Sequence, residues 1–232
     1  MNRKPIFDAI RDQRGGTFTE DEVRLIDALL DKLGIISASR PASVEAKHKL
    51  RDAQVFFSVV RKLTGPLDQV QADTINNLLL SAAHWPVGWV AYGLATAWHE
   101  ARLKPIAEIG KGRGHKYGMP GQYGGQVPYG RGLVQLTWDF NYRWADEILG
   151  LNGKLLANFD LALDPDIATR ILVVGMETGA FTGRGLAGYI GQRGTQGEFV
   201  AARHIINGTD RAKLIAGYAV RFQDALEAGG WS

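Results

Sequence analysis

A glycine-rich segment near the middle of the chain most strongly limits what this sequence can fold into. Its nine glycines are Gly110, Gly112, Gly114, Gly118, Gly121, Gly124, Gly125, Gly130 and Gly132. Glycine is unfavourable inside helices and strands because it loses more backbone freedom on folding than other residues. Tyr117, Tyr123 and Tyr129 are interleaved with these glycines and argue against plain disorder. A long loop that is ordered is usually functional, so we expect a functional loop here.

Apolar residues at helical spacing lie on both sides of this loop. Helices are predicted over residues 46–63, 67–83, 86–103, 142–149, 166–178, 198–206 and 210–226. Pro86 suits the first turn of the third helix, and Pro105 is expected to end it. Residues 133–138 are apolar and partly alternating, which predicts a strand or hairpin arm. The chain is therefore expected to be mainly α with a small β element.

The N-terminal residues have a pattern of their own. Residues 1–36 are expected to form a short helical arm, because Thr19 and Glu22 make a capping box before a run of apolar residues at helical spacing. Residues 37–44 are polar around Pro41 and are typical of a linker. The main domain is then expected to span residues 45–232. A chain of 232 residues suits one large domain with a small appendage.

Composition excludes several kinds of site. The chain has no cysteine, which rules out disulfides, thiolate zinc sites and cysteine nucleophiles. The formal charge of +3 and the pI near 9.1 are mildly basic and favour an anionic surface such as a bacterial envelope, although such a charge is also ordinary. No basic run with interleaved aromatic residues suggests a nucleic-acid partner. The five histidines do not have the spacing of a zinc-binding helix, so we expect neither a metal nor another cofactor.

The sequence also predicts where the protein is located and whether it forms oligomers. Residues 1–14 lack the apolar core of a secretory signal, and no stretch approaches 18 apolar residues, so neither export by a signal peptide nor membrane insertion is expected. No exposed apolar heptad pattern suggests an oligomer, and we expect a monomer.

Two glutamates are the first candidates for chemistry. Glu100 lies at the end of an otherwise apolar predicted helix, beside Trp98. Partial burial would raise the pKa of its carboxyl and suit it to donate a proton near neutral pH. Pro105 allows the chain to turn and bring Glu108 back toward the same place. Glycoside hydrolysis needs two such carboxyls, but two solvated glutamates at a helix end would be the commoner explanation of this pair alone.

The segment that follows the glycine-rich loop is dense in polar and aromatic side chains. Gln135 and Asn141 can exchange hydrogen bonds with hydroxyl and acetamido groups, and Thr137 can orient a water. The aromatic residues that offer flat apolar faces to sugar rings are Tyr129, Trp138 and Tyr142. Taken alone, such aromatic residues are more often part of a hydrophobic core. The context of the two glutamates favours a sugar-binding segment.

Four groups of motifs follow one another along residues 46–226. They are Trp98-His99-Glu100, Lys104-Pro105-Ile106-Ala107-Glu108, Tyr129-Gly130-Arg131-Gly132 with Gln135-Leu136-Thr137 and Asn141-Tyr142, and Ile205-Ile206-Asn207-Gly208. These motifs resemble those of the family 19 glycoside hydrolases, which include chitinases and phage-type endolysins. The short interval between the two glutamates is most similar to the compact endolysin branch. The resemblance implies a lysozyme-like fold with two helical lobes and a cleft between them.

The resemblance also implies a role for individual residues. Glu100 would be the general acid, Glu108 the general base, and Thr137 would help to hold the attacking water. The substrate would be bound by His99, Tyr129, Gln135, Trp138, Asn141, Tyr142, Asn207 and Arg211. Within this set, His99 would support the position of Glu100, and Arg211 would bond near the second glutamate. The family inverts the anomeric configuration, which predicts about 6.5–9.5 Å between the two carboxyl groups.

We therefore expect a peptidoglycan-degrading endolysin of the lysozyme type, a bacteriolytic glycosidase that cuts β-1,4 bonds between amino sugars. It would be made in the host cytoplasm and would reach the cell wall through a membrane pore made by another protein. Three alternatives stay open: a chitinase of the same fold, a zinc-dependent wall amidase, and a non-catalytic wall-binding module.

Overall fold

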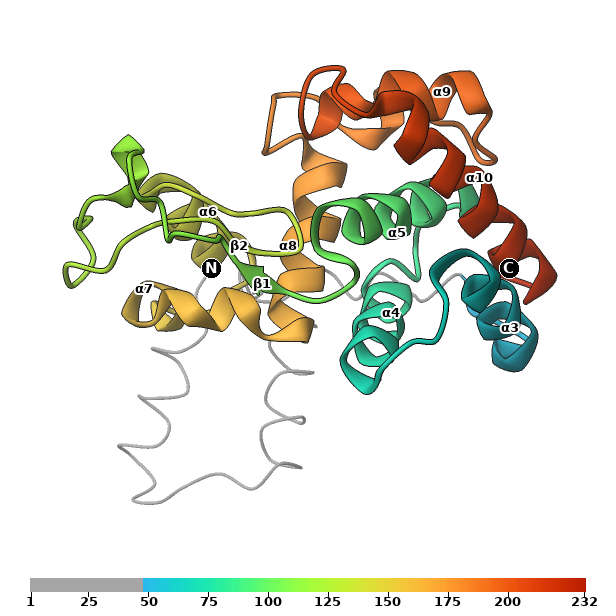
Figure 1. Ribbon diagram of the computed structural model, residues 1–232, viewed down its shortest axis with the longest axis horizontal. Helices are drawn as coiled ribbons and strands as arrows, with labels where there is room; N and C mark the ends of the chain where they lie inside the picture. The colour runs from blue at the N-terminus through green and yellow to red at the C-terminus, as the bar shows by residue number, and fades with distance from the viewer. Residues whose placement is uncertain (1–47) are drawn as a thin grey trace, which may run out of the picture. The chain divides into compact units, whose positions relative to one another are not determined.

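The computed structural model describes residues 48–232, and its fold is mainly α, as the sequence predicts (Figure 1). The predicted arm (1–36), the linker (37–44) and the start of the main domain lie outside the described residues. No helix in the described range is long and apolar enough to cross a membrane.

Within residues 48–232 the α-helices are α3 (Ala53–Thr64), α4 (Gln69–Ser81), α5 (Val87–Ala101), α6 (Asp139–Ile148), α7 (Lys154–Ala157), α8 (Pro165–Thr178), α9 (Gln196–Ala201) and α10 (Ala212–Ala228). Short 3-10 helices are η1 (Lys116–Gly118), η2 (Phe159–Leu163), η3 (Leu186–Gly188) and η4 (Ala202–Ile205). Two short strands, β1 (Ile106–Ala107) and β2 (Arg131–Gly132), pair antiparallel. The β pair therefore closes the glycine-rich loop at its base.

The larger hydrophobic core forms around α5. This helix is buried on almost every side, because its sequence is rich in small and apolar residues, and it packs against α10 (Figure 1). Its glycines permit close approach: a Cβ at Gly88 would lie 2.6 Å from the backbone nitrogen of Gly194. The core that surrounds it includes Trp85, Tyr92 and Phe222, all fully buried. The last turn of α5, which carries Glu100, is thus fixed by a well-packed helix.

A second, smaller core belongs to the segment from β2 to η2. Leu136, Tyr142, Leu155 and Phe159 form its centre and are buried. Helix α8 contributes to both cores, since Leu172 packs into the first and the neighbouring Ile171 into the second. The two cores agree with the predicted two-lobed helical fold.

Several element boundaries differ from the predictions. Helix α5 ends at Ala101 and not at the predicted Leu103, because Arg102 adopts a left-handed conformation with φ 52° and its N–H caps the preceding turn. Residues 133–138, predicted to be a strand or hairpin arm, do not form a strand: residues 133–135 are a turn. The strand lies at Arg131–Gly132, and positive φ angles at Gly132 and Gln135 turn the chain away from an extended course. From this segment only Leu136 forms a bridge, back to Arg131.

Candidate active site

Glu100 is held at the end of α5 by a buried arginine. Arg203 Nη1 donates to Glu100 Oε1 at 2.7 Å, and Arg203 Nε donates to the carbonyl oxygen of Asp210 at 2.9 Å. The side chain of Arg203 is only 2% exposed, whereas that of Glu100 is 22% exposed. The arginine therefore joins α5 to η4 and to the chain that precedes α10. The Glu100 side chain is partly buried, as expected, but it also contacts a buried cation that the sequence analysis did not name.

The geometry leaves one oxygen of Glu100 available. Among residues 48–232, the only side chain that bonds this carboxyl is Arg203, through Oε1. Oε2 receives no hydrogen bond from the described protein atoms, and the side chain is partly exposed. One oxygen is thus fixed in orientation while the other can meet a ligand.

Arg203 was not among the residues that the sequence analysis selected. A signal for it exists in the sequence, because Phe199, Arg203 and Ile206 lie at helical spacing and would share one apolar face. An arginine on such a face is rarely buried without a charged partner. The sequence alone does not say which of the chain's acidic residues is that partner.

Glu108 follows β1 directly and is fixed by the glycine-rich loop. The amide of Gly130 donates to Glu108 Oε2 at 3.0 Å, and the hydroxyl of Tyr117 donates to Oε1 at 3.1 Å. The Glu108 amide donates back to the carbonyl oxygen of Gly130 at 2.7 Å. Burial, together with the Glu108 carboxylate, raises the pKa of Tyr117, so its hydroxyl stays protonated and can donate. The Glu108 carboxylate is therefore held in one orientation through both of its oxygens.

Gln135 packs against Gly130, the glycine whose amide bonds this carboxylate. A Cβ at Gly130 would lie 2.8 Å from Gln135 Oε1, so a larger residue would require the Gln135 side chain to move. Gln135 Nε2 donates to the carbonyl oxygen of Ile106 at 3.2 Å. The side chain predicted to bind sugar therefore braces β1 in this structure, and its contact with a sugar stays a prediction.

Two of the three aromatic residues predicted to contact sugar are buried in this structure. Tyr142 is fully buried and stacks on Phe159, with ring centroids 4.0 Å apart. Tyr129 is 7% exposed, and its ring lies 3.5 Å from the guanidinium carbon of Arg131. Asp160 pairs with the same guanidinium at 2.7 Å. Tyr129 and Tyr142 thus enclose a buried arginine, and neither presents a ring face to solvent.

Replacing Tyr142 with phenylalanine should lower stability rather than substrate affinity. The Tyr142 hydroxyl donates to the carbonyl oxygen of Tyr129 at 2.8 Å and accepts from Arg131 Nη1 at 3.0 Å. Loss of a buried hydroxyl leaves its partners unsatisfied and costs about 1–3 kcal/mol. We expect a Tyr142→Phe protein to unfold at lower denaturant with an unchanged KM. An unchanged unfolding midpoint with a raised KM would restore the sugar-contact interpretation.

Trp138 is the predicted aromatic contact that does reach the surface. It is 37% exposed, meets Tyr117 edge-on at 5.5 Å and stacks with the exposed Phe140 at 6.2 Å. These three rings line a hollow of about 300 Å³. Since Tyr117 also bonds Glu108, the hollow adjoins the second glutamate. An aromatic wall beside a carboxylate is suited to the apolar face of a sugar ring.

Among residues 48–232, Asn141, Asn207 and Arg211 make no hydrogen bond or ion pair with either glutamate. Asn141 Nδ2 donates to the carbonyl oxygen of Thr137 at 2.8 Å, which fixes the start of α6. Asn207 is exposed beyond η4, and its amide donates to the carbonyl oxygen of Arg203. Arg211 is exposed, with its Nε 4.0 Å from Asp210, so the predicted bond near the second glutamate is wrong in this structure. Of the two candidate glutamates, Glu100 is the one that an arginine bonds within residues 48–232, and that arginine is Arg203.

His99 lies beside Glu100, and its pKa is depressed. Burial is the largest cause, Glu100 opposes the change, and Arg203, Arg102 and Arg211 add to it. The unfolded chain therefore binds a proton more readily than the folded one, so stability should fall as pH drops below about 6.5. We expect this loss to shrink in a His99→Gln protein. Unfolding free energies of both proteins at pH 7.5 and 5.5 would measure it, and equal losses would contradict the assignment.

Comparisons with known proteins relate the fold to a class of solved structures. No family model matches the sequence, and no curated protein matches it. The crystal structure of chitinase C from Streptomyces griseus HUT6037 is similar, with a TM-score of 0.51 and 20% identity over 84% of this chain and 85% of that chain. The crystal structure of a chitinase C mutant has a TM-score of 0.48 and 20% identity over 75% of each chain. At this identity the likeness to the first structure shows a shared fold.

Proposed function

We propose that this chain hydrolyses β-1,4 glycosidic bonds in an amino-sugar polymer, with Glu100 as general acid and Glu108 as general base. The observation that carries the proposal is that two carboxyl groups are each held by a different set of hydrogen-bond donors. Glu100 has one oxygen on Arg203 and one available, while Glu108 is oriented by Gly130 and Tyr117. The motifs that resemble family 19 glycoside hydrolases contain both glutamates.

Each carboxyl has a distinct role in the proposed reaction. Glu100 gives its proton to the glycosidic oxygen as the bond to the anomeric carbon breaks. Glu108 takes a proton from a water that attacks this carbon from the opposite face, and Thr137 helps to hold that water. The products are a shortened chain with an inverted anomeric centre and a second chain with a free hydroxyl. The two carboxyls must then stand about 6.5–9.5 Å apart, so that substrate and water fit between them.

We propose peptidoglycan as the polymer. The short interval between Glu100 and Glu108 resembles the endolysin branch of the family, and a pI near 9.1 suits an anionic wall. The enzyme would then act on the wall after passing through a membrane pore, and the result would be cell lysis. Chitin is the second candidate, because the structures of similar fold are named chitinases.

The products released from two polymers test the function. The protein would be incubated with purified sacculi and with colloidal chitin, and new reducing ends and new free amino groups would be measured. Reducing ends from sacculi are expected. Reducing ends from chitin alone would select the chitinase, and free amines that disappear in EDTA would select a zinc-dependent amidase. Binding to sacculi without either product would indicate a non-catalytic module.

A further inference from the structure

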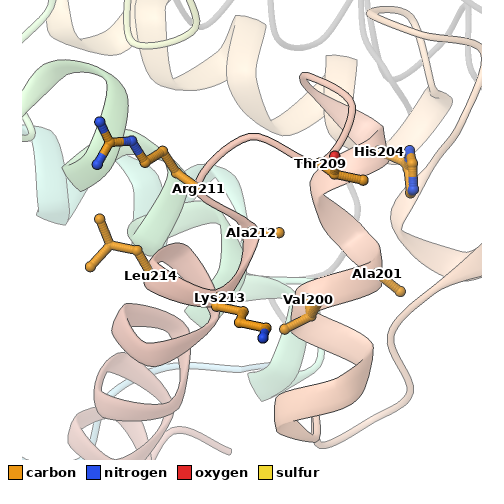
Figure 2. A pocket seen from close by; sticks show the side chains of 8 residues that line it. All are labelled: Val200, Ala201, His204, Thr209, Arg211, Ala212, Lys213 and Leu214. Carbon is orange, nitrogen blue, oxygen red and sulfur yellow. The ribbon is translucent and has the colours of Figure 1, made fainter.

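A surface pocket lies between the stretch that contains Arg203 and the start of α10. It has a volume of about 550 Å³, within the range of small-ligand sites. One wall is the helical stretch that carries Val200, Ala201 and His204, and the other is the start of α10 (Figure 2). Arg203 bonds Glu100, while its neighbour His204 lines the pocket. The pocket therefore includes the residue that follows, in the chain, the arginine bonded to the proposed acid.

The side chains that line this pocket are basic or uncharged. Its charged and titratable members are His204, Arg211 and Lys213, and no acidic residue is among the lining residues. Within residues 48–232, Lys213 forms no ion pair, and the closest carboxylate to Arg211 is that of Asp210, at 4.0 Å. Lys213 thus presents a positive charge that no ion pair within residues 48–232 neutralises, while Arg211 has one carboxylate at the limit of ion-pair distance.

The two cations lie at different places in the pocket. Figure 2 shows Lys213 extending from α10 toward the turn that carries Val200, and Arg211 projecting to the side opposite His204. Arg211 is also close enough to His99 to contribute to the lowered pKa of that residue. Arg211 therefore lines the pocket and is also within electrostatic range of His99, the residue beside Glu100.

We propose that this pocket binds a carboxylate on a side branch of the polymer, and that Lys213 and Arg211 thereby favour an anionic strand over a neutral one. The inference rests on the proposed function, because it assumes that a strand occupies the site beside Glu100. Chitin carries no charge, whereas the peptide branches of peptidoglycan end in carboxylates. Charge complementarity at the edge of a site increases specificity and association rate more than it increases raw affinity. The pocket gives a physical reason for choosing peptidoglycan.

A matched pair of ligands tests the pocket without turnover. One probe is a soluble disaccharide peptide from peptidoglycan with free carboxylates, and the other is the same compound with its carboxylates converted to amides. At low salt we expect the acid probe to bind the wild-type protein about tenfold more tightly, and added salt to reduce this ratio. In Lys213→Gln the ratio should fall to about threefold or less, and Lys213→Arg should restore it.

Arg221→Gln is the control, because Arg221 is another exposed cation on α10 that does not line the pocket. This variant should keep the wild-type ratio. Equal affinity of the wild-type protein for the two probes would overturn the inference. A Lys213→Gln protein that still prefers the acid probe about tenfold would overturn it as well. Since the assay measures binding, a protein that shows the ratio but hydrolyses no polymer would contradict the proposed function instead.

Discussion

A Glu100→Gln protein should fold normally and lose about 10²–10⁴-fold in kcat, since a general acid typically contributes that much. Glutamine has the shape of glutamate and keeps an oxygen that can accept from Arg203 Nη1, but it has no proton to give. The fold should therefore survive, because the bond between α5 and η4 has an uncharged substitute. Turnover of soluble substrate fragments and a denaturation curve would measure the two effects separately.

Glu147→Gln is the matched control for this variant. Glu147 lies on α6, is 70% exposed and pairs with Arg143 at 3.7 Å, so the same chemical change removes only a surface ion pair. Such pairs contribute about 0–1 kcal/mol to stability, and no effect on kcat is expected. Full activity of Glu100→Gln would contradict the role of Glu100, whereas a loss accompanied by unfolding would show a structural role only.

Arg203→Met should cause the largest loss of stability among single changes at this site. Arg203 is almost fully buried and bonds both Glu100 and the carbonyl oxygen of Asp210, so its removal leaves two acceptors without their donor. Breaking a buried ion pair costs about 3–5 kcal/mol, and partial exposure of Glu100 should keep the loss toward the lower end of that range. Unfolding in urea would measure it. Activity should fall as well, because the proposed acid loses its fixed orientation.

A double-mutant cycle separates the charge from the packing. If the loss comes mainly from an uncompensated carboxylate, Arg203→Met should cost less when Glu100 is already glutamine, and the difference gives the coupling energy. Arg193→Met is the control, because Arg193 pairs with Glu227 on the surface and should cost no more than about 1 kcal/mol. Equal costs of Arg203→Met in both backgrounds would show that the ion pair contributes nothing beyond packing.

Local sequence patterns predicted the helices well. Helices α4, α5, α8 and α10 carry apolar residues at helical spacing, and each lies within a predicted range or close to it. The end of α5 was misplaced because Arg102 adopts a left-handed conformation, which glycine and asparagine adopt more readily than arginine does. The short elements α7 and η2 were not predicted, since segments of four and five residues have too few positions to show a period.

The candidate site was predicted in part. Glu100 and Glu108 were recognised by their place after an apolar helix and by their motifs, and the structure gives each a defined set of hydrogen-bond donors. Arg203 was missed because its partner is 103 residues away in the chain, and such pairing depends on how α5 and η4 meet. Tyr142 was misassigned because an aromatic residue in a polar motif can face either solvent or a buried arginine. Local sequence does not distinguish the two cases.

The anomeric configuration of the first product tests the central claim most directly. Wild-type protein would act on a soluble amino-sugar oligomer in the probe of an NMR spectrometer, and the new reducing end would be observed before mutarotation. Two carboxyls that act from opposite faces of the sugar ring predict the α anomer from a β-1,4 bond. The β anomer, or release of no reducing end at all, would contradict an inverting hydrolase built on Glu100 and Glu108.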